Sequence, residues 1–251
     1  MADYSLWQSS NEGYSWVQHY PQETFLAFYH HKYSSDRAYA ITSGKKIFYT
    51  TNTGRSWHSA EAPTLPNTFG QAVLHFHPES DYLIWTGEDD CSGRGENCHA
   101  VAHYSRDNGR TWNLLDTYIR NCAWARDATL FTDPTEIICE SYKEKTGNQK
   151  QFQLSNPLEL IEGTNYYGRK KKLFDHVVGF AKFSEYLIVA EVRRTLASIL
   201  IFPLADTSYP VPATETRARY PGFSRWNKLR DRFIPTNDAT RSTRLFISVS
   251  V

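Results

Sequence analysis

The hydrophobic residues of this 251-residue chain occur in short runs, most of them bounded by Gly, Asn, Asp or Pro. KKIFYTT at 45–51 and AVAHYS at 100–105 each lead directly into a turn sequence that contains Gly. Strands of a hairpin have this pattern, whereas an amphipathic helix needs apolar residues at a spacing of about 3.6. The pattern therefore predicts many short β-strands.

An eight-residue motif occurs three times among these predicted strands: SSNEGYSW at 9–16, TTNTGRSW at 50–57 and SRDNGRTW at 105–112. Each copy has Ser or Thr, then Asn or Asp, then Gly, then Ser or Thr followed by Trp. The residues shared by the three copies are Asn11, Gly13 and Trp16; Asn52, Gly54 and Trp57; and Asp107, Gly109 and Trp112.

A second repeated element places an acidic residue before a hydrophobic run. Asp36, Asp81 and Glu185 are 45 and 104 residues apart, and the larger spacing equals two periods. The copy between the last two has diverged, around 128–142. A period of about 40 to 55 residues with several strands per unit is typical of a β-propeller built from four-stranded blades.

The motif itself is expected to form the turn of a blade hairpin. The glycine supplies a positive φ without a Cβ penalty, and the Asn or Asp side chain accepts hydrogen bonds from backbone N–H groups across the turn. The tryptophan starts the next strand, and we expect all three tryptophans to be buried between neighbouring sheets, contributing roughly 2 to 3 kcal/mol each. This is the Asp-box, or BNR repeat, found in sialidases and in sortilins.

Other chemistry fits the motif less well. A calcium loop needs several carboxylates, and TTNTGRSW has none. Sialidases carry an Arg-Ile-Pro motif ahead of the first box, whereas the nearest text here, RFIP at 232–235, follows every box. The histidines lack zinc-site spacing and are interpreted as strand and loop residues. The sequence therefore predicts no catalytic, metal or cofactor residue.

The four cysteines form two local groups. Cys91 and Cys98 stand at the ends of a short Gly-rich loop, which suits a small disulfide, and Cys122 and Cys139 flank a strand-turn-strand segment that could bring them together. Paired cysteines favour an oxidising compartment over reduced thiols. The N-terminus shows no signal-peptide pattern, and no apolar run is long enough to span a membrane.

Residues 82–149, which contain all four cysteines and the third box, closely resemble the luminal Vps10 domains of fungal vacuolar sorting receptors, which are related to animal sortilins. Residues 170–192 resemble the next stretch of that family. The resemblance covers roughly residues 3–192. It implies an all-β fold, a partial propeller whose blades belong to a ten-bladed ring, in a receptor that is not an enzyme.

The resemblance also implies a function. Such receptors bind soluble vacuolar hydrolases, with carboxypeptidase Y as the known fungal cargo, in the Golgi lumen and carry them towards endosomes and the vacuole. A longer parent protein would hold Cys-rich modules and one membrane span. No nucleic-acid partner is implied, and no cargo-contact residue can be transferred to a numbered position here. The alternatives are a stand-alone luminal or secreted propeller that binds protein or glycan, and an Asp-box glycosidase.

The chain departs from the family after Val192. Residues 1–192 hold about three and a half blades by the repeat count, while 193–251 are rich in Pro, Ser, Thr and Arg and contain no repeat element. This second segment carries a net charge of +6, and the preceding one carries −5. We therefore expect a fragment of a propeller followed by an irregular basic tail, disordered over 206–244 or produced by a shifted reading frame.

Overall fold

A computed structural model of the chain describes residues 4–68, 72–79, 81–91, 95–125, 135–149, 156–183, 186–193, 196–203 and 247–250. These residues form seventeen strands and one four-residue helix. All strand pairings are antiparallel. The prediction of an all-β fold is confirmed.

The N-terminal part forms two separate sheets. The first is the two-stranded hairpin of β1 (Leu6–Gln8) and β2 (Val17–His19). The second is a four-stranded meander in the order β3-β4-β5-β6, made of β3 (Phe25–His30), β4 (Ala38–Thr42), β5 (Lys46–Thr50) and β6 (His58–Glu61). This second sheet has the strand order of one complete propeller blade.

The remaining strands form one continuous sheet of eleven strands, in the order β17-β16-β15-β14-β13-β12-β11-β10-β9-β7, with β8 also paired to β9. Its members are β7 (Leu65–Pro66), β8 (Leu74–Phe76), β9 (Leu83–Asp89), β10 (His99–Ser105), β11 (Asn113–Trp124), β12 (Ile137–Tyr142), β13 (Leu158–Gly163), β14 (Arg169–Phe183), β15 (Tyr186–Arg193), β16 (Leu196–Pro203) and β17 (Ile247–Ser250).

Two long strands keep this sheet continuous by changing partners. Strand β11 pairs with β10 up to Ile119 and with β12 from Ile119 to Trp124. Strand β14 pairs with β13 up to Val177 and with β15 from Val177 onward, with a register shift between Val177 and Gly179. Bulges of this kind bend a strand and increase its twist, so one strand can serve two successive layers.

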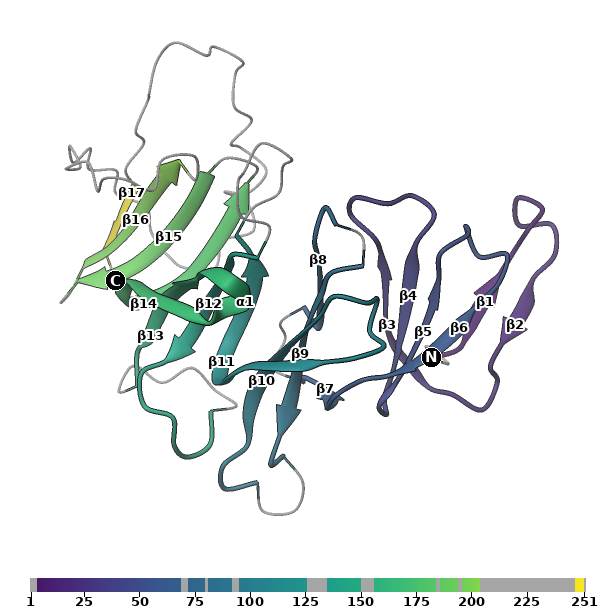
Figure 1. Ribbon diagram of the computed structural model, residues 1–251, viewed down its shortest axis with the longest axis horizontal. Coiled ribbons are helices and arrows are strands. Elements are labelled where there is room, and N and C mark those ends of the chain that lie inside the picture. The colour runs from purple at the N-terminus through teal and green to yellow at the C-terminus, as the bar shows by residue number, and fades with distance from the viewer. Residues whose placement is uncertain are drawn as a thin grey trace, which may run out of the picture.

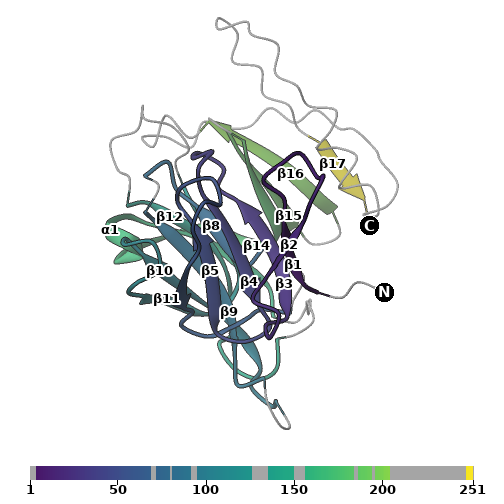
Figure 2. The same ribbon diagram turned by 90° about the vertical axis from the view of Figure 1, so that its right-hand side faces the viewer.

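The sheets follow one another along the molecule in chain order (Figure 1), and a view turned by 90° shows them one behind another (Figure 2). Hydrophobic side chains fill the spaces between successive layers. Tyr39 and Ile41 of β4 pack against Leu83 and Trp85 of β9, while Phe25, Ala40 and Phe48 face the opposite way and pack with Leu6 of β1. Because side chains alternate along a strand, the four-stranded sheet buries residues on both faces, as an inner propeller blade does.

The one helix, α1 (Thr164–Tyr167), has left-handed backbone angles, with φ of +52° at both Asn165 and Tyr166. Left-handed non-glycine residues are strained. The carbonyl of Thr135 accepts a hydrogen bond from the N–H of Tyr166 at 3.0 Å, and the hydroxyl of Thr135 accepts one from the N–H of Asn165 at 2.9 Å. The ring of Tyr166 also stacks on Tyr104 at 4.9 Å, so tertiary contacts offset the local strain.

Regular structure continues past residue 192. Strand β16 pairs with β15 over its whole length, with Arg193 opposite Leu196 and Tyr186 opposite Pro203. Strand β17 pairs with β16 in turn. The segment expected to be disordered, 206–244, lies outside the described residues. The division of the chain at 192 thus remains a prediction, with two strands on its C-terminal side.

Candidate functional site

The three repeated motifs form the same turn in each hairpin. The glycine has a positive φ in each copy: +91° at Gly13, +80° at Gly54 and +82° at Gly109. The glycine N–H donates to the hydroxyl of the first residue of the motif, at 2.7, 2.9 and 2.8 Å in Ser9, Thr50 and Ser105. The positive φ explains why glycine occupies this position in all three copies.

The Asn or Asp side chain braces the turn. In each copy its Oδ1 accepts the backbone N–H of the residue four positions later at 2.9 Å. The two asparagines also donate their amide to the hydroxyls of Ser15 and Ser56. In the third copy the direction reverses, because a carboxylate has no proton to donate: the Thr111 hydroxyl donates to Asp107 at 2.6 Å.

Asp107 is ionised and fully engaged in this network. Slight burial raises the pKa of its carboxyl, but the stronger combined effect of hydrogen bonds from Thr111 and Ser105 places the pKa below its ordinary value. Its hydrogen bonds remain within the turn. The geometry is that of a structural brace.

The tryptophans contradict part of the expectation. Trp16 is 58% exposed, so the prediction that it is buried is wrong. Trp57 and Trp112 are half-buried, and each indole N–H reaches the layer before it: Trp57 donates to the side chain of Gln8 at 2.9 Å, and Trp112 donates to the carbonyl of Glu61 at 3.0 Å. Among the described residues no layer precedes Trp16, and this explains its exposure.

The structure contains a second repeated turn that the sequence pattern did not predict. His31 and His77 are both buried, and Nδ1 of each accepts the backbone N–H two residues later, at 3.1 and 2.9 Å. Their own N–H groups donate to the carbonyls of Arg37 and Tyr82. The two turns are similar in sequence, HKYSSD at 31–36 and HPESD at 77–81, but they differ in length by one residue, so the similarity is not evident without an alignment gap. These histidines are structural counterparts of each other.

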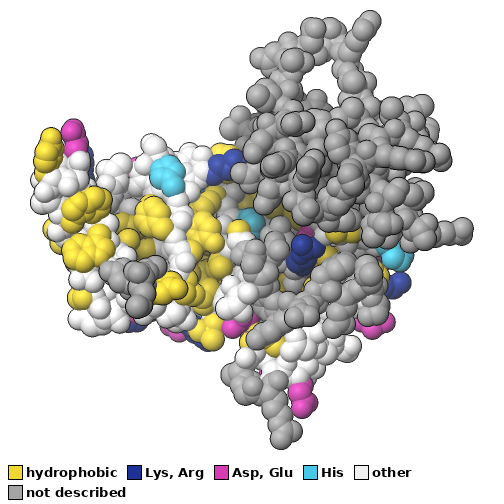
Figure 3. Space-filling view, turned by 180° about the vertical axis from the view of Figure 1, so that it is seen from behind, with side chains coloured by type: hydrophobic (Ala, Val, Ile, Leu, Met, Phe, Trp, Pro, Cys, Tyr) yellow, Lys and Arg dark blue, Asp and Glu magenta, His cyan; other side chains and the backbone are white. Residues whose placement is uncertain are grey.

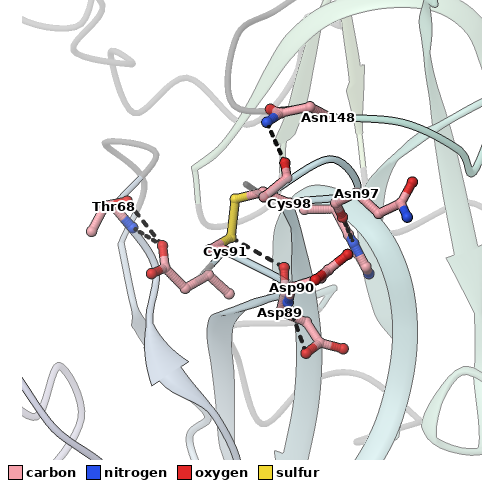
Figure 4. Close-up of a disulfide and its surroundings, with 10 residues drawn as sticks. Thr68, Asp89, Asp90, Cys91, Asn97, Cys98 and Asn148 are labelled. Carbon is pink, nitrogen blue, oxygen red and sulfur yellow. Dashed lines mark hydrogen bonds between the residues drawn. A yellow bond between two sulfur atoms is a disulfide. The ribbon is translucent and has the colours of Figure 1, made fainter. Parts of the chain in front are cut away.

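Both predicted cysteine pairs form disulfides, Cys91 with Cys98 and Cys122 with Cys139. The second links residues directly opposite each other on β11 and β12. The first closes a loop at the end of β9, to which the amide of Asn148 donates a hydrogen bond at the Gly95 carbonyl, at 2.7 Å (Figure 4). The N–H of Gln149 donates to the carbonyl of Cys98 at 2.9 Å, so a distant segment is fastened to this loop.

Asp116 and Glu140 are two of the buried carboxylates that lie outside the repeated motifs. Asp116 contacts the ammonium groups of Lys145 and Lys170, and although burial raises its pKa, these cations bring the pKa below the ordinary value. Glu140 is only 3% exposed, and burial raises its pKa to about 7 despite Arg120 and a hydrogen bond from the Phe180 N–H. Asp116 is thus held charged, whereas Glu140 titrates near neutrality.

His75 is half-buried with its Nε2 shielded from solvent, and desolvation lowers its pKa to about 4, so it is neutral near pH 7. Within the described ranges, no group of three or more His, Cys, Asp or Glu side chains is arranged to hold a metal ion. The same part of the chain contains no helix long and apolar enough to cross a membrane.

A groove of about 290 Å³ lies between β1 and the four-stranded sheet. Its walls include Trp7 of β1, Phe28 and His30 of β3, and Trp57 and Gly54 of the second repeated motif. The groove therefore adjoins the N-terminal hairpin, whose outer edge is not paired by any described residue.

Comparison with known proteins finds a family and several curated relatives to which this chain is similar. A family profile described as Sortilin-Vps10 (sortilin, neurotensin receptor 3) matches residues 4–204. "Vacuolar protein sorting/targeting protein 10" of Laccaria bicolor is 65% identical over 199 residues, which are 78% of this chain and 14% of that protein. The protein of the same name from Mycosarcoma maydis is 46% identical over 204 residues, with the same two coverages.

The chain thus spans about a seventh of the length of these curated relatives. Among solved structures, "YCF48 bound to D1 peptide" superposes with a TM-score of 0.42 at 14% identity, covering 78% of this chain and 57% of that one.

Proposed function

Since this chain belongs to the Sortilin-Vps10 family, we propose that it is part of a sorting receptor that binds soluble vacuolar hydrolases, such as a carboxypeptidase Y-like cargo, and carries them from the Golgi to endosomes and the vacuole. The observation that carries the proposal is the 65% identity to a protein named for vacuolar sorting and targeting. The chain would serve as a binding module without catalytic activity.

The hydrogen bonds of the Asn or Asp side chain in the repeated motifs support a non-enzymatic role. The carboxylate of the third motif, Asp107, accepts hydrogen bonds from Ser105 and Thr111 within its own turn. In the other two copies an asparagine takes the same position and makes the same backbone hydrogen bond. A position that accepts either a carboxylate or an amide is suited to bracing a turn and is poorly suited to acid–base catalysis.

The two disulfides support a luminal location, because disulfides persist in the oxidising secretory pathway and are rare in the cytosol. We place this part of the receptor in the lumen of the Golgi and endosomes. The membrane span that the family implies would belong to the longer protein.

Deleting the gene and following a vacuolar carboxypeptidase tests the proposal. We expect the hydrolase to appear in the culture medium and to return to the vacuole when the full-length protein is restored. The purified luminal part should also bind the hydrolase directly, with a catalytically inactive hydrolase as the ligand. Normal vacuolar delivery in the deletion strain, together with no binding in vitro, would contradict the proposal.

A further inference from the structure

The two disulfides of this chain differ in how accessible their cysteines are. Cys122 and Cys139 are both 0% exposed and stand opposite each other on paired strands. In the other disulfide Cys98 is also 0% exposed, whereas Cys91, just beyond the end of β9, is partly exposed. Thiol–disulfide exchange requires a thiolate to reach one of the two bonded sulfur atoms. Cys91 is therefore the cysteine at which an external thiol can attack.

The surroundings of Cys91 are acidic. Asp89, Asp90 and Glu96 are all exposed and lie close to Cys91 in the chain. The space-filling view from behind shows acidic side chains on the projecting part of the molecule where the hairpin of β9 and β10 ends (Figure 3). Carboxylates lower the local concentration of anions, so they disfavour an anionic thiol such as glutathione. The site thus favours a reductant that carries no carboxylate.

The loop closed by this disulfide fastens one end of a distant segment, 143–149 (Figure 4). The amide of Asn148 donates to the carbonyl of Gly95 at 2.7 Å, and the N–H of Gln149 donates to the carbonyl of Cys98 at 2.9 Å. The N–H of Cys98 also donates to the carbonyl of Gly95 at 3.2 Å, so one small turn presents both acceptors. The disulfide holds this turn against the end of β9.

The other end of the segment is attached independently of the disulfide. The backbone N–H and carbonyl of Glu144 each form a hydrogen bond of 2.8 Å with the side-chain amide of Asn156. Between the two attachments, Lys145 contacts the buried carboxylate of Asp116. Opening the disulfide would therefore release one end of the segment, and it would weaken the contact between Lys145 and Asp116.

We propose that the Cys91–Cys98 disulfide is a reversible exchange site for a dithiol, and that its opening releases segment 143–149 from the loop. A thiolate of the reductant attacks Sγ of Cys91, the S–S bond breaks, and Cys98 leaves as a thiolate that takes up a proton. The second thiol of the reductant then displaces Cys91 from the mixed disulfide. The reductant ends as a disulfide and the chain as two thiols, and the reverse exchange closes the loop.

This inference does not depend on the cargo proposed above. The disulfide between Cys122 and Cys139 stays closed during the exchange, because neither of its cysteines is exposed. The strands that it joins therefore keep their pairing while the loop opens. The device is local, and it changes the attachment of one segment without unfolding the sheet.

Selective reduction of the folded 251-residue chain tests the site. The chain is treated with dithiothreitol, alkylated at intervals and analysed by mass spectrometry. We expect Cys91 and Cys98 to be labelled about tenfold or more faster than Cys122 and Cys139. Glutathione should react more slowly, and Asp89→Asn combined with Asp90→Asn should narrow the difference between the two reductants. Equal labelling rates for the two disulfides overturn the proposal.

Hydrogen exchange tests the release of the segment. Reduction should speed exchange of the Gln149 N–H, which donates to Cys98, and should leave exchange of β12 unchanged. The double variant Cys91→Ser with Cys98→Ser should show the same pattern without a reductant. Unchanged exchange at Gln149 after reduction overturns the proposed release. Faster exchange throughout the strands overturns it as well, because the disulfide would then support the whole fold.

The link between disulfide and segment is reciprocal, so loss of the contact should make the disulfide easier to reduce. Asn148→Ala removes the hydrogen bond to Gly95 and should shift the equilibrium with dithiothreitol towards the reduced form by about threefold to tenfold. The matched control Asn97→Ala changes an exposed asparagine of the same loop and should leave the equilibrium unchanged. Equal shifts in the two variants, or no shift in either, overturn the proposed coupling.

Discussion

We expect Glu140 to couple the stability of this chain to pH. Its carboxylate accepts the N–H of Phe180 at 2.8 Å, and the Nε of Arg120 lies 3.9 Å away. The guanidinium of Arg120 donates to the carbonyl of Val178. Both side chains thus hold the bulge between Val177 and Gly179, where β14 changes partners from β13 to β15. The perturbation is Glu140→Gln, which keeps an oxygen acceptor for Phe180 and removes the titration.

The expected magnitude follows from the pKa of Glu140, which is about 7 in the folded chain against 4.5 ordinarily. A carboxyl with a raised pKa favours the folded state when it is protonated, so its stabilising contribution is complete below about pH 4.5 and is lost as the pH rises through about 7. Lowering the pH from about 8 to about 5.5 should therefore recover about 2 kcal/mol of unfolding free energy from this group, using 1.36 kcal/mol per pKa unit.

Urea denaturation of both proteins at about pH 8 and about pH 5.5 measures this effect as a difference of differences. The unfolding free energy of Glu140→Gln minus that of wild type should be about 2 kcal/mol larger at about pH 8 than at about pH 5.5. His75, whose pKa is lowered to about 4, destabilises both proteins below about pH 6.5, and its contribution cancels. The control Glu61→Gln removes an exposed carboxylate.

The reasoning is refuted if the stability difference between Glu140→Gln and wild type is the same at both pH values. It is also refuted if the variant loses stability relative to wild type when the pH rises from about 5.5 to about 8, because the ion pair with Arg120 would then outweigh the cost of burying the charge.

Four further outcomes are expected. Asp107→Ala should lower the unfolding free energy by about 1 to 2 kcal/mol, while Asp107→Asn, which restores the arrangement of the other two motifs, should cost less, as urea denaturation will show. Gly109→Ala should also destabilise by about 1 kcal/mol or more, since φ is +82° and the added Cβ would lie 3.2 Å from the indole of Trp112. Replacing Cys122 and Cys139 together by Ser should lower the free energy by about 3 kcal/mol, whereas retention of the wild-type melting temperature would contradict the loop-entropy argument. A fluorogenic sialoside should remain intact with the wild-type chain, and turnover abolished by one carboxylate substitution would overturn the proposed non-enzymatic role.

The sequence alone determined the features that depend on local chemistry. A turn with positive φ requires glycine and favours an Asx brace, so the three hairpins at 9–16, 50–57 and 105–112 could be recognised and their hydrogen bonds anticipated. Cysteines at the ends of a short loop or of a hairpin are close whatever the rest of the chain does, and both pairs were anticipated for that reason. The resemblance of 82–149 to a known family supplied the rest of the fold class.

Only the tertiary structure decided which layers meet. The burial of Trp57 and Trp112 and the exposure of Trp16 depend on whether a preceding layer is present, although the three motifs are alike in sequence. Burial raises the pKa of Glu140, and this burial depends on the packing of the surrounding strands; Arg120 and the N–H of Phe180, which are 20 and 40 residues away in the chain, oppose the shift only in part. Local sequence specifies a turn by its own backbone geometry, whereas burial and ionisation depend on neighbours that folding brings together from distant parts of the chain.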